Sequence, residues 1–363
     1  MKWLVAVALA ACGSSGPVAP EPQKIAATAQ GTPIDVKPSL EVTSEEVTFS
    51  AGANQVPGTL VHPTSGGPYA GIILMAGSGP TDRDWNSPLL PAKNGSAKLL
   101  AEELAKHGMV VLRFDKAGVG GNKTDLTKAT LDVYRDEGQA ALAFLRTRHE
   151  VAPKALFVAG HSEGGLHAMR VALAEGDHIA GLVLLSAPGR SLMTVMLGQV
   201  ESQLRTAMPQ QADAQLASLK KALDDFVAGQ AVDPTKVAVV APLQQLVAAV
   251  VNPGTATLSR GLLAFDPVAA VAQVRVPVFV FNGEKDIQVD PTKDAKALAA
   301  AAKGATLFLG PDANHVLKHE TKTVAELRAD LASVQMSYNA DDRTLDDATV
   351  KALVGWLAAH AMH

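Results

Sequence analysis

Short, unbroken apolar runs recur along the chain from about residue 70 and are bounded by glycine or polar residues. Runs of this length are typical of strands. Strands that are apolar on both faces are typical of a parallel sheet covered on both sides. The predicted strands are residues 71–75, 109–114, 155–159, 181–185, 278–281 and 305–309. Before them, the alternating segments 46–50 and 58–62 predict a hairpin.

Amphipathic helical patterns fill most of the intervals between these strands. Apolar side chains recur three and four positions apart, which is the spacing of one helix face. The predicted helices are residues 97–105, 129–147, 163–175, 291–303 and 346–361. Alternating strands and helices predict an α/β fold with a mostly parallel central sheet, right-handed crossovers and helices on both faces.

One long interval, between the predicted strands 181–185 and 278–281, breaks this alternation. Its pattern is helical, with Leu216, Leu219 and Leu223 sharing a face, and it contains no convincing strand. An insertion of this length in a compact α/β pattern is usually functional. We therefore expect a core formed by residues 41–188 and 266–363, with a helical cap formed by residues 189–265.

The first forty residues follow neither pattern. Lys2 precedes an apolar run at residues 3–11 and then Cys12, the only cysteine of the chain. This run is far shorter than the roughly 20 residues that span a bilayer, but it suits a signal-peptide core. The proline-bearing segment that follows lacks the apolar side chains needed to offset ordering entropy. Residues 1–11 are thus predicted to be a signal peptide and residues 12–40 a flexible tether.

The sequence Leu9-Ala10-Ala11-Cys12 resembles the lipobox of bacterial lipoproteins. The resemblance implies that Cys12 is lipidated and begins the mature protein, which would be exported and anchored to a membrane of the bacterial cell envelope. A plain secretory signal is the alternative, and it would leave the protein periplasmic or secreted.

Composition narrows the possible partners. The 363 residues are 47% hydrophobic and 19% charged, with a net charge of −4, which is ordinary for a globular protein. With this net charge we do not expect a basic surface that binds nucleic acid. One cysteine excludes a cysteine-rich zinc site and an intrachain disulfide.

The sharpest chemical signal is the sequence Gly160-His161-Ser162-Glu163-Gly164, which follows a predicted strand and precedes a predicted helix. A serine on such a turn has its hydroxyl raised at the end of the sheet, and small residues are needed where the backbone crowds it. Ser162 is therefore the predicted nucleophile. His161 and His167 lie beside it in the sequence and are interpreted as packing or turn residues.

A serine nucleophile needs a base, and the base needs an orienting acid. Asp286 follows the predicted strand 278–281, and His315 follows the next one. Both are expected at the carboxyl edge of the sheet, where open α/β folds bind ligands. Glu284 and Asp290 are alternative acids, and His319 is the alternative base.

An acyl-transfer intermediate also needs donors for its oxyanion. One predicted donor is the backbone N–H of Glu163. The other is expected from the glycine-rich loop after strand 71–75, with the N–H of Ser78 favoured and that of Gly77 second.

Taken together, Gly160–Gly165, Gly77–Asp84, the Asp286 loop and Ala313-Asn314-His315 resemble bacterial α/β-hydrolases of the serine-esterase and aminopeptidase-like group. The resemblance covers roughly residues 45–361 and implies an α/β-hydrolase fold and hydrolysis of an acyl bond without metal or organic cofactor. The chain departs from that pattern in two places. Ala76 stands where many relatives carry histidine, and Lys116 and Ala117 alter the Asp-x-x-Gly-x-Gly turn that begins at Asp115.

The predicted function is cleavage of small or medium carboxylic esters through an acyl-enzyme on Ser162, His315 and Asp286. A peptidase, amidase or thioesterase on the same residues is the alternative, with the cap carboxylates Asp224 and Asp225 as candidate ligands for an amino terminus. A non-catalytic, lipid-anchored binding protein is a third possibility. The Asp82-Arg83-Asp84 run is interpreted as a salt-bridged loop.

Overall fold

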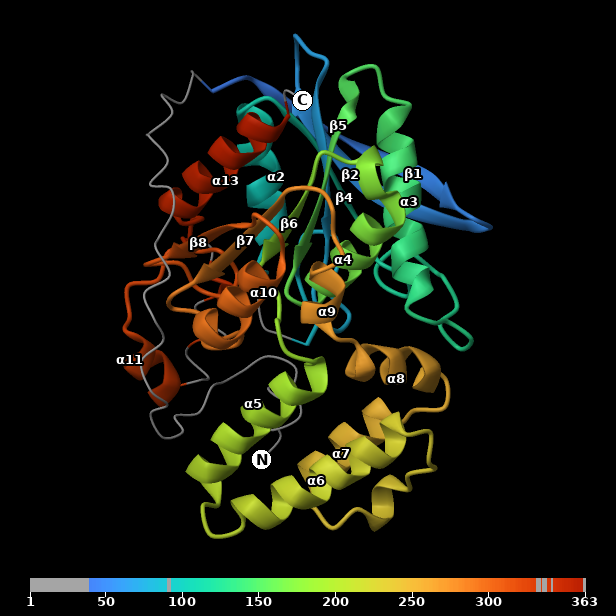
Figure 1. Ribbon diagram of the computed structural model, residues 1–363, viewed down its shortest axis with the longest axis vertical. Helices are drawn as coiled ribbons and strands as arrows, with labels where there is room; N and C mark the ends of the chain where they lie inside the picture. Colours follow the sequence, from blue (N-terminus) through green and yellow to red (C-terminus); the bar gives the residue numbers. More distant parts are fainter. Residues whose placement is uncertain (1–38, 90–92, 331–333, 335–337, 341, 362–363) are drawn as a thin grey trace.

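A single sheet of eight strands forms the centre of the computed structural model, which describes residues 39–89, 93–330, 334, 338–340 and 342–361 (Figure 1). The strand order is β1-β2-β4-β3-β5-β6-β7-β8. β1 and β2 are antiparallel to their neighbours, and β4, β3, β5, β6, β7 and β8 are parallel. The predicted mostly parallel sheet is thus confirmed. The strands are β1 (Val42–Ala51), β2 (Asn54–Pro63), β3 (Tyr69–Met75), β4 (Met109–Phe114), β5 (Val151–His161), β6 (Gly181–Leu185), β7 (Val278–Gly283) and β8 (Thr306–Gly310).

The predicted hairpin is also present. β1 and β2 pair in an antiparallel register that sets Glu46 opposite Thr59. Gly52 closes the turn with a φ of 60°, which glycine adopts without the steric cost that a Cβ brings.

Helices cover both faces of the sheet. On one face lie α2 (Ser96–Lys106) and α13 (Asp347–His360); on the other lie α3 (Asp132–Arg146), α4 (Glu163–Glu175), α9 (Pro267–Val271) and α10 (Lys296–Ala301). The strands bury Phe157 and Phe279 against Trp356 of α13. Burial of each phenylalanine side chain contributes about 1.5–3 kcal/mol. The helix predicted at residues 291–303 was wrong in detail, since Pro291–Ala295 forms a π-helical turn before α10.

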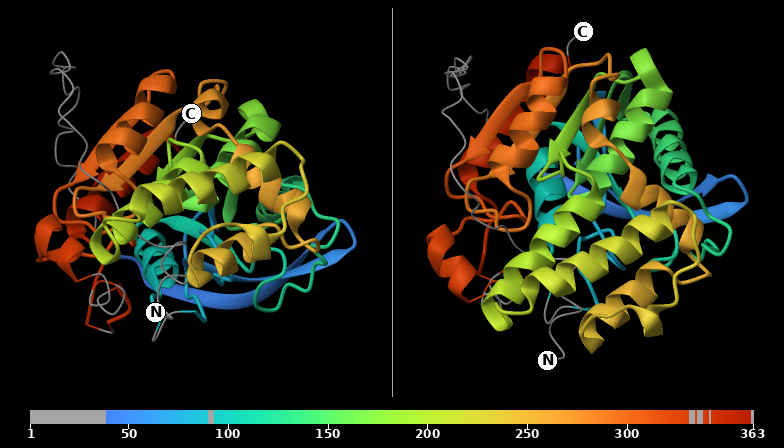
Figure 2. Two further views of the ribbon diagram at one scale, coloured as in Figure 1. Left: turned by 90° about the horizontal axis from the view of Figure 1, so that it is seen from below. Right: turned by 60° about the horizontal axis from the view of Figure 1, so that its bottom comes forward.

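Between β6 and β7, every residue of which the structure describes, the chain forms helices and no strand. The four longest are α5 (Leu192–Ala207), α6 (Ala212–Val227), α7 (Ala241–Val250) and α8 (Ala256–Ala264). Figures 1 and 2 show them as a separate layer beyond one end of the sheet. They enclose an apolar cluster of their own that includes Leu219, Leu223 and Leu243. The boundaries of a cap domain at residues 189 and 265 stay a prediction.

The N-terminal predictions fall outside the described part of the chain. Residues 1–38 include the predicted signal peptide, Cys12 and almost all of the predicted tether. Within the described ranges, no helix is both long and apolar enough to cross a membrane.

Candidate active site

Ser162 occupies a strained turn between β5 and α4. Its φ is 53° and its ψ is −126°, a backbone conformation that residues other than glycine rarely adopt. Such strain costs about 1–3 kcal/mol and is concentrated at functional sites. The flanking glycines are required sterically, because a Cβ on Gly160 would lie 2.1 Å from the carbonyl oxygen of Gly164. A Cβ on Gly164 would lie 2.4 Å from the carbonyl oxygen of Met75.

The turn leaves the Ser162 side chain half-buried at the carboxyl end of β5. The Ser162 hydroxyl forms no hydrogen bond with any described residue, while its backbone N–H is held by the carbonyl of Leu185 at 2.9 Å. The N-terminus of α4 begins at the next residue, and its free N–H groups favour negative charge nearby.

Asp286 and His315 form a buried pair. Nδ1 of His315 lies 2.8 Å from Oδ2 of Asp286, and the two residues are 4% and 3% exposed. The other carboxylate oxygen, Oδ1, accepts the backbone N–H groups of Gln288 at 2.7 Å and Val289 at 3.0 Å. Because a carboxylate can only accept, the imidazole must donate from Nδ1, which leaves Nε2 free to accept a proton.

The competing acids and base occupy other environments. Glu284 is exposed, and Asp290 caps the π-helical turn by accepting the backbone N–H groups of Thr292 and Lys293. His319 lies 3.6 Å from Asp346, with half of its side chain exposed. The geometry therefore favours Asp286 and His315 over these alternatives.

His161, interpreted from the sequence as a packing or turn residue, packs directly against His315, a partner that the sequence did not indicate. Its ring lies between the indole of Trp85, at a centroid distance of 4.5 Å, and the imidazole of His315, at 4.8 Å. Nε2 of His161 donates to the backbone carbonyl of His315 at 2.8 Å. Burial, together with the neighbouring His315, lowers the pKa of His161 to about 3, so the ring is neutral at ordinary pH. The one signal available in the sequence was its position next to Ser162.

The glycine-rich loop after β3 lies against Ser162. A Cβ on Gly77 would lie 3.2 Å from Cβ of Ser162, so a side chain at this position would require a small shift of the loop or of Ser162. The loop is held on both sides of Ser78. Nζ of Lys116 donates to the carbonyl of Gly77 at 2.5 Å, and the Thr81 hydroxyl donates to the carbonyl of Ser78 at 2.6 Å.

A buried charged cluster, formed by Lys116, Glu163 and His167, lies beneath this loop. The Glu163 carboxylate is 3.7 Å from Nζ of Lys116 and 3.3 Å from Nε2 of His167. Burial alone would raise the pKa of Glu163, but attraction by Lys116 and the bond to His167 outweigh it and lower that pKa to about 2. Burial lowers the pKa of Lys116, and Glu163 opposes this effect. Sequence reasoning had considered only the backbone N–H of Glu163.

Arg83 joins the neighbouring loops. Its guanidinium binds the Asp115 carboxylate at 3.1 and 2.9 Å, and that carboxylate also accepts the N–H of Gly121 at 2.9 Å. Arg113 forms an ion pair with Asp84. These contacts confirm the interpretation of residues 82–84 as a salt-bridged loop.

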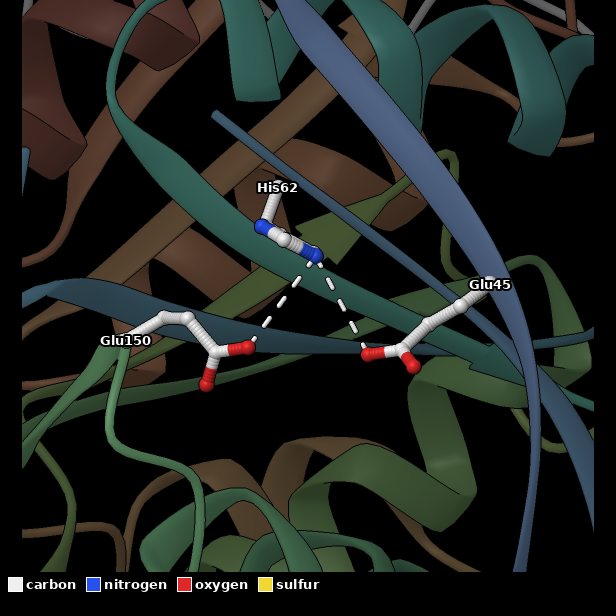
Figure 3. A group of neighbouring side chains, drawn as sticks. All are labelled: Glu45, His62 and Glu150. Carbon is white, nitrogen blue, oxygen red and sulfur yellow. Dashed lines mark ion pairs between the residues drawn. The ribbon is translucent and has the colours of Figure 1, made fainter. Parts of the chain in front are cut away.

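One group of described side chains has the donor types and spacing of a metal site: Glu45, His62 and Glu150, shown in Figure 3. Nε2 of His62 is 3.9 Å from Glu45 and 4.0 Å from Glu150. However, Arg148 already binds both carboxylates, at 2.5 and 2.7 Å. We therefore assign the group to an ion-pair network that fastens the β1–β2 hairpin to the start of β5.

The sheet order, the strained serine turn and the buried Asp–His pair together define the α/β-hydrolase class of proteins. Residues 93–322 match the model of the family described as serine aminopeptidase, S33. Because this match covers more than half of the 363 residues, the chain belongs to that family.

The similar proteins described next share less than a quarter of their residues with this chain. Esterase EstD of Thermotoga maritima is 24% identical over 268 residues, which make up 73% of this chain and 58% of the esterase. The chain thus spans little more than half the length of that relative. A proline iminopeptidase from Mycobacterium smegmatis superposes with a TM-score of 0.50 at 17% identity, over 81% of this chain and 99% of its own. A hypothetical protein from Pseudomonas aeruginosa gives 0.52 at 16% identity, over 93% and 98%. These two structures show a shared fold alone.

Proposed function

We propose that the protein is a serine hydrolase that cleaves carboxylic esters of small or medium acyl chains. The observation that carries this proposal is the buried bond between Asp286 and His315, formed at the same edge of the sheet as the strained turn of Ser162. Membership of the S33 family and the likeness to an esterase support the same class of chemistry.

In the proposed mechanism, Oγ of Ser162 attacks the ester carbonyl carbon and its proton passes to Nε2 of His315. Asp286 holds the imidazole in the tautomer that can accept this proton and stabilises the imidazolium that results. Collapse of the tetrahedral intermediate breaks the carbon–oxygen bond, and the departing alkoxide takes the proton from His315. Water then attacks the acyl-enzyme in the same way, releasing the acid and restoring the Ser162 hydroxyl.

The tetrahedral intermediate places a negative charge on the former carbonyl oxygen. We propose that the backbone N–H groups of Glu163 and Ser78 donate to it, with Gly77 as the alternative second donor. Two observations support this proposal: Glu163 is the first residue of α4, directly after Ser162, and Gly77, the residue before Ser78, lies against Ser162.

The cap carboxylates Asp224 and Asp225 give no support to the alternative peptidase function. An aminopeptidase must hold a free ammonium group, and Asp224 and Asp225 were the candidates for this role. Each is already paired at 2.6 Å with a lysine one helical turn earlier, Lys220 and Lys221 respectively. Both pairs are partly exposed, as expected of a solvated helix face rather than a binding pocket.

The helices after β6 are proposed to form a cap that selects the acyl chain. Val195 and Gly198 of α5 line a cavity of about 150 Å³ that also borders Asp286 and Gln288. The preference for an aliphatic chain over a stacked ring rests on the low aromatic content of the sequence, 4% overall. Exchanging residues 189–265 with those of a relative should change acyl preference while preserving labelling of Ser162.

A membrane location is proposed from the sequence alone. Lipidation at Cys12 would hold the catalytic domain near a bilayer, since each buried methylene contributes about 0.8 kcal/mol and several chains together anchor firmly.

The decisive experiment combines labelling with a substrate panel. A fluorophosphonate should label the protein on Ser162, and Ser162→Ala should abolish labelling without changing the circular dichroism spectrum. A panel of p-nitrophenyl esters, acyl thioesters and aminoacyl amides then separates esterase, thioesterase and peptidase. Absence of both labelling and turnover would favour a binding protein instead.

A further inference from the structure

Lys116 is a buried lysine that the proposed mechanism does not use. It is 6% exposed and lies in the turn after β4. A lysine ammonium is rarely buried without partners, because desolvation is costly. Its partners are the carbonyl of Gly77 at 2.5 Å and the carboxylate of Glu163 at 3.7 Å.

The bond to Gly77 fixes a whole peptide group. The carbonyl of Gly77 and the N–H of Ser78 belong to the same planar unit, in which a trans geometry points the two bonds in opposite directions. When Lys116 holds that oxygen, the Ser78 N–H must point away from Lys116. The Thr81 bond to the next carbonyl limits rotation on the other side of Ser78.

The ion pair with Glu163 involves the residue whose backbone N–H is the other proposed donor. Glu163 is the first residue of α4, so its backbone N–H follows directly after Ser162. Its carboxylate is anchored between Lys116 and His167. One ammonium group therefore contacts the Gly77 carbonyl, which shares a peptide with the Ser78 N–H, and the side chain of Glu163, whose backbone N–H is the other proposed donor.

We propose that Lys116 is the positioning residue of the oxyanion hole, holding the Gly77–Ser78 peptide and the Glu163 end of α4 at a fixed separation. This inference rests on the proposed function. Strand order explains how it arises, since β4, β3 and β5 are adjacent in the sheet and carry Lys116, Gly77 and Glu163 directly after their carboxyl ends.

The test replaces Lys116 by methionine, which keeps most of the aliphatic stem and removes the ammonium. Two quantities are measured: kcat and KM on a p-nitrophenyl ester, and Ki for a trifluoromethyl ketone with the same acyl chain. The ketone carbon accepts Oγ of Ser162, the hydroxyl proton passes to His315, and the ketone oxygen becomes an oxyanion. Removing one oxyanion donor lowers kcat about 10²–10³-fold, so a misaligned donor should cost about 10–100-fold, with KM nearly unchanged. Ki should rise by the same factor as kcat falls.

Glu137→Gln is the matched control. Glu137 lies in the same buried region and accepts bonds from the N–H of Ala117 and the amide of Asn122, but not from the Gly77 loop. This variant should change stability and leave both kcat and Ki within about two-fold of the wild-type values. If Lys116→Met does not fold, Lys116→Gln is measured instead, because its shorter side chain also loses the reach to Gly77.

The outcomes separate the two proposals. If a folded Lys116 variant melts at a lower temperature but keeps wild-type kcat and Ki, Lys116 is merely structural, and the esterase proposal stands. If wild-type protein is neither labelled at Ser162 nor active on any ester, the proposed function fails and the role of Lys116 fails with it. A parallel change in kcat and Ki, with the Glu137 variant unaffected, supports the inference.

Discussion

Replacing Asp286 by asparagine should lower activity far more than the loss of one charge would suggest, because of how the two carboxylate oxygens are used. Oδ1 accepts two backbone N–H groups, from Gln288 and Val289. In Asp286→Asn, the amide oxygen must remain at Oδ1, since an NH₂ group there would face two donors. The amide NH₂ then faces Nδ1 of His315 and also loses the weaker bond that Oδ2 accepts from the Asn282 amide at 3.3 Å.

That arrangement selects the wrong imidazole tautomer. Nδ1 of His315 would accept a hydrogen bond instead of donating one, so the proton would move to Nε2, and Nε2 could no longer take the Ser162 proton. The same change in a well-characterised serine protease lowers kcat about 10⁴-fold. We expect a loss of about 10³–10⁴-fold in kcat, equivalent to about 4–5.5 kcal/mol of barrier.

The assay is the initial rate of p-nitrophenyl ester hydrolysis at saturating substrate, with circular dichroism to verify the fold. Glu284→Gln is the control, because this exposed carboxylate lies two residues before Asp286. It should retain wild-type kcat within about two-fold. If Asp286→Asn kept most of its kcat while Glu284→Gln lost it, the assignment of Asp286 as the acid would be refuted.

Three further predictions follow from other residues. His315→Ala should abolish ester hydrolysis while His319→Ala retains most of it, as measured by kcat; the reverse result would move the base to His319. Burial raises the pKa of Glu137 from its ordinary 4.5 to about 7. Between these values the folded protein binds more protons than the unfolded one, so the free energy of unfolding should fall with rising pH, by about 3 kcal/mol at most. Urea unfolding at pH 5 and pH 8 should show this loss in wild-type protein but not in Glu137→Gln, whereas equal losses in both would contradict it. Finally, Cys12→Ser should release activity from the membrane fraction or block processing, and an intact mass without lipid in the wild-type protein would rule out the anchor.

Much of the fold was predictable because strands that are buried on both faces of the sheet are continuous apolar runs in the sequence. The runs at residues 71–75 and 181–185 are unbroken apolar segments, and each is a strand flanked by parallel neighbours. Helix ends were less predictable. The segment 291–303 has helical composition throughout, but Pro291 and the cap by Asp290 open it with a wider turn that composition does not reveal.

The pairing of Asp286 with His315 was also accessible to sequence reasoning. Each follows a strand, and adjacent parallel strands deliver their following loops to the same edge. The neighbours of the pair were not accessible. Trp85 reaches His161 from a loop with no periodic pattern, and nothing in its surroundings distinguishes it from a surface aromatic.

Lys116 was only partly predictable from the sequence, unlike the Asp286–His315 pair, which was predictable, and Trp85, which was not. The resemblance to the Asp-x-x-Gly-x-Gly turn draws attention to residue 116, but the turn alone does not indicate which group the lysine side chain contacts. That information resides in the strand order, because β3, β4 and β5 are consecutive along the chain, whereas in the sheet β3 lies between β4 and β5. Only this order places the turn after β4 within reach of both Gly77 and Glu163. A charged residue in a loop at the sheet edge is therefore best interpreted together with the loops that follow the adjacent strands, because its binding partners are expected there.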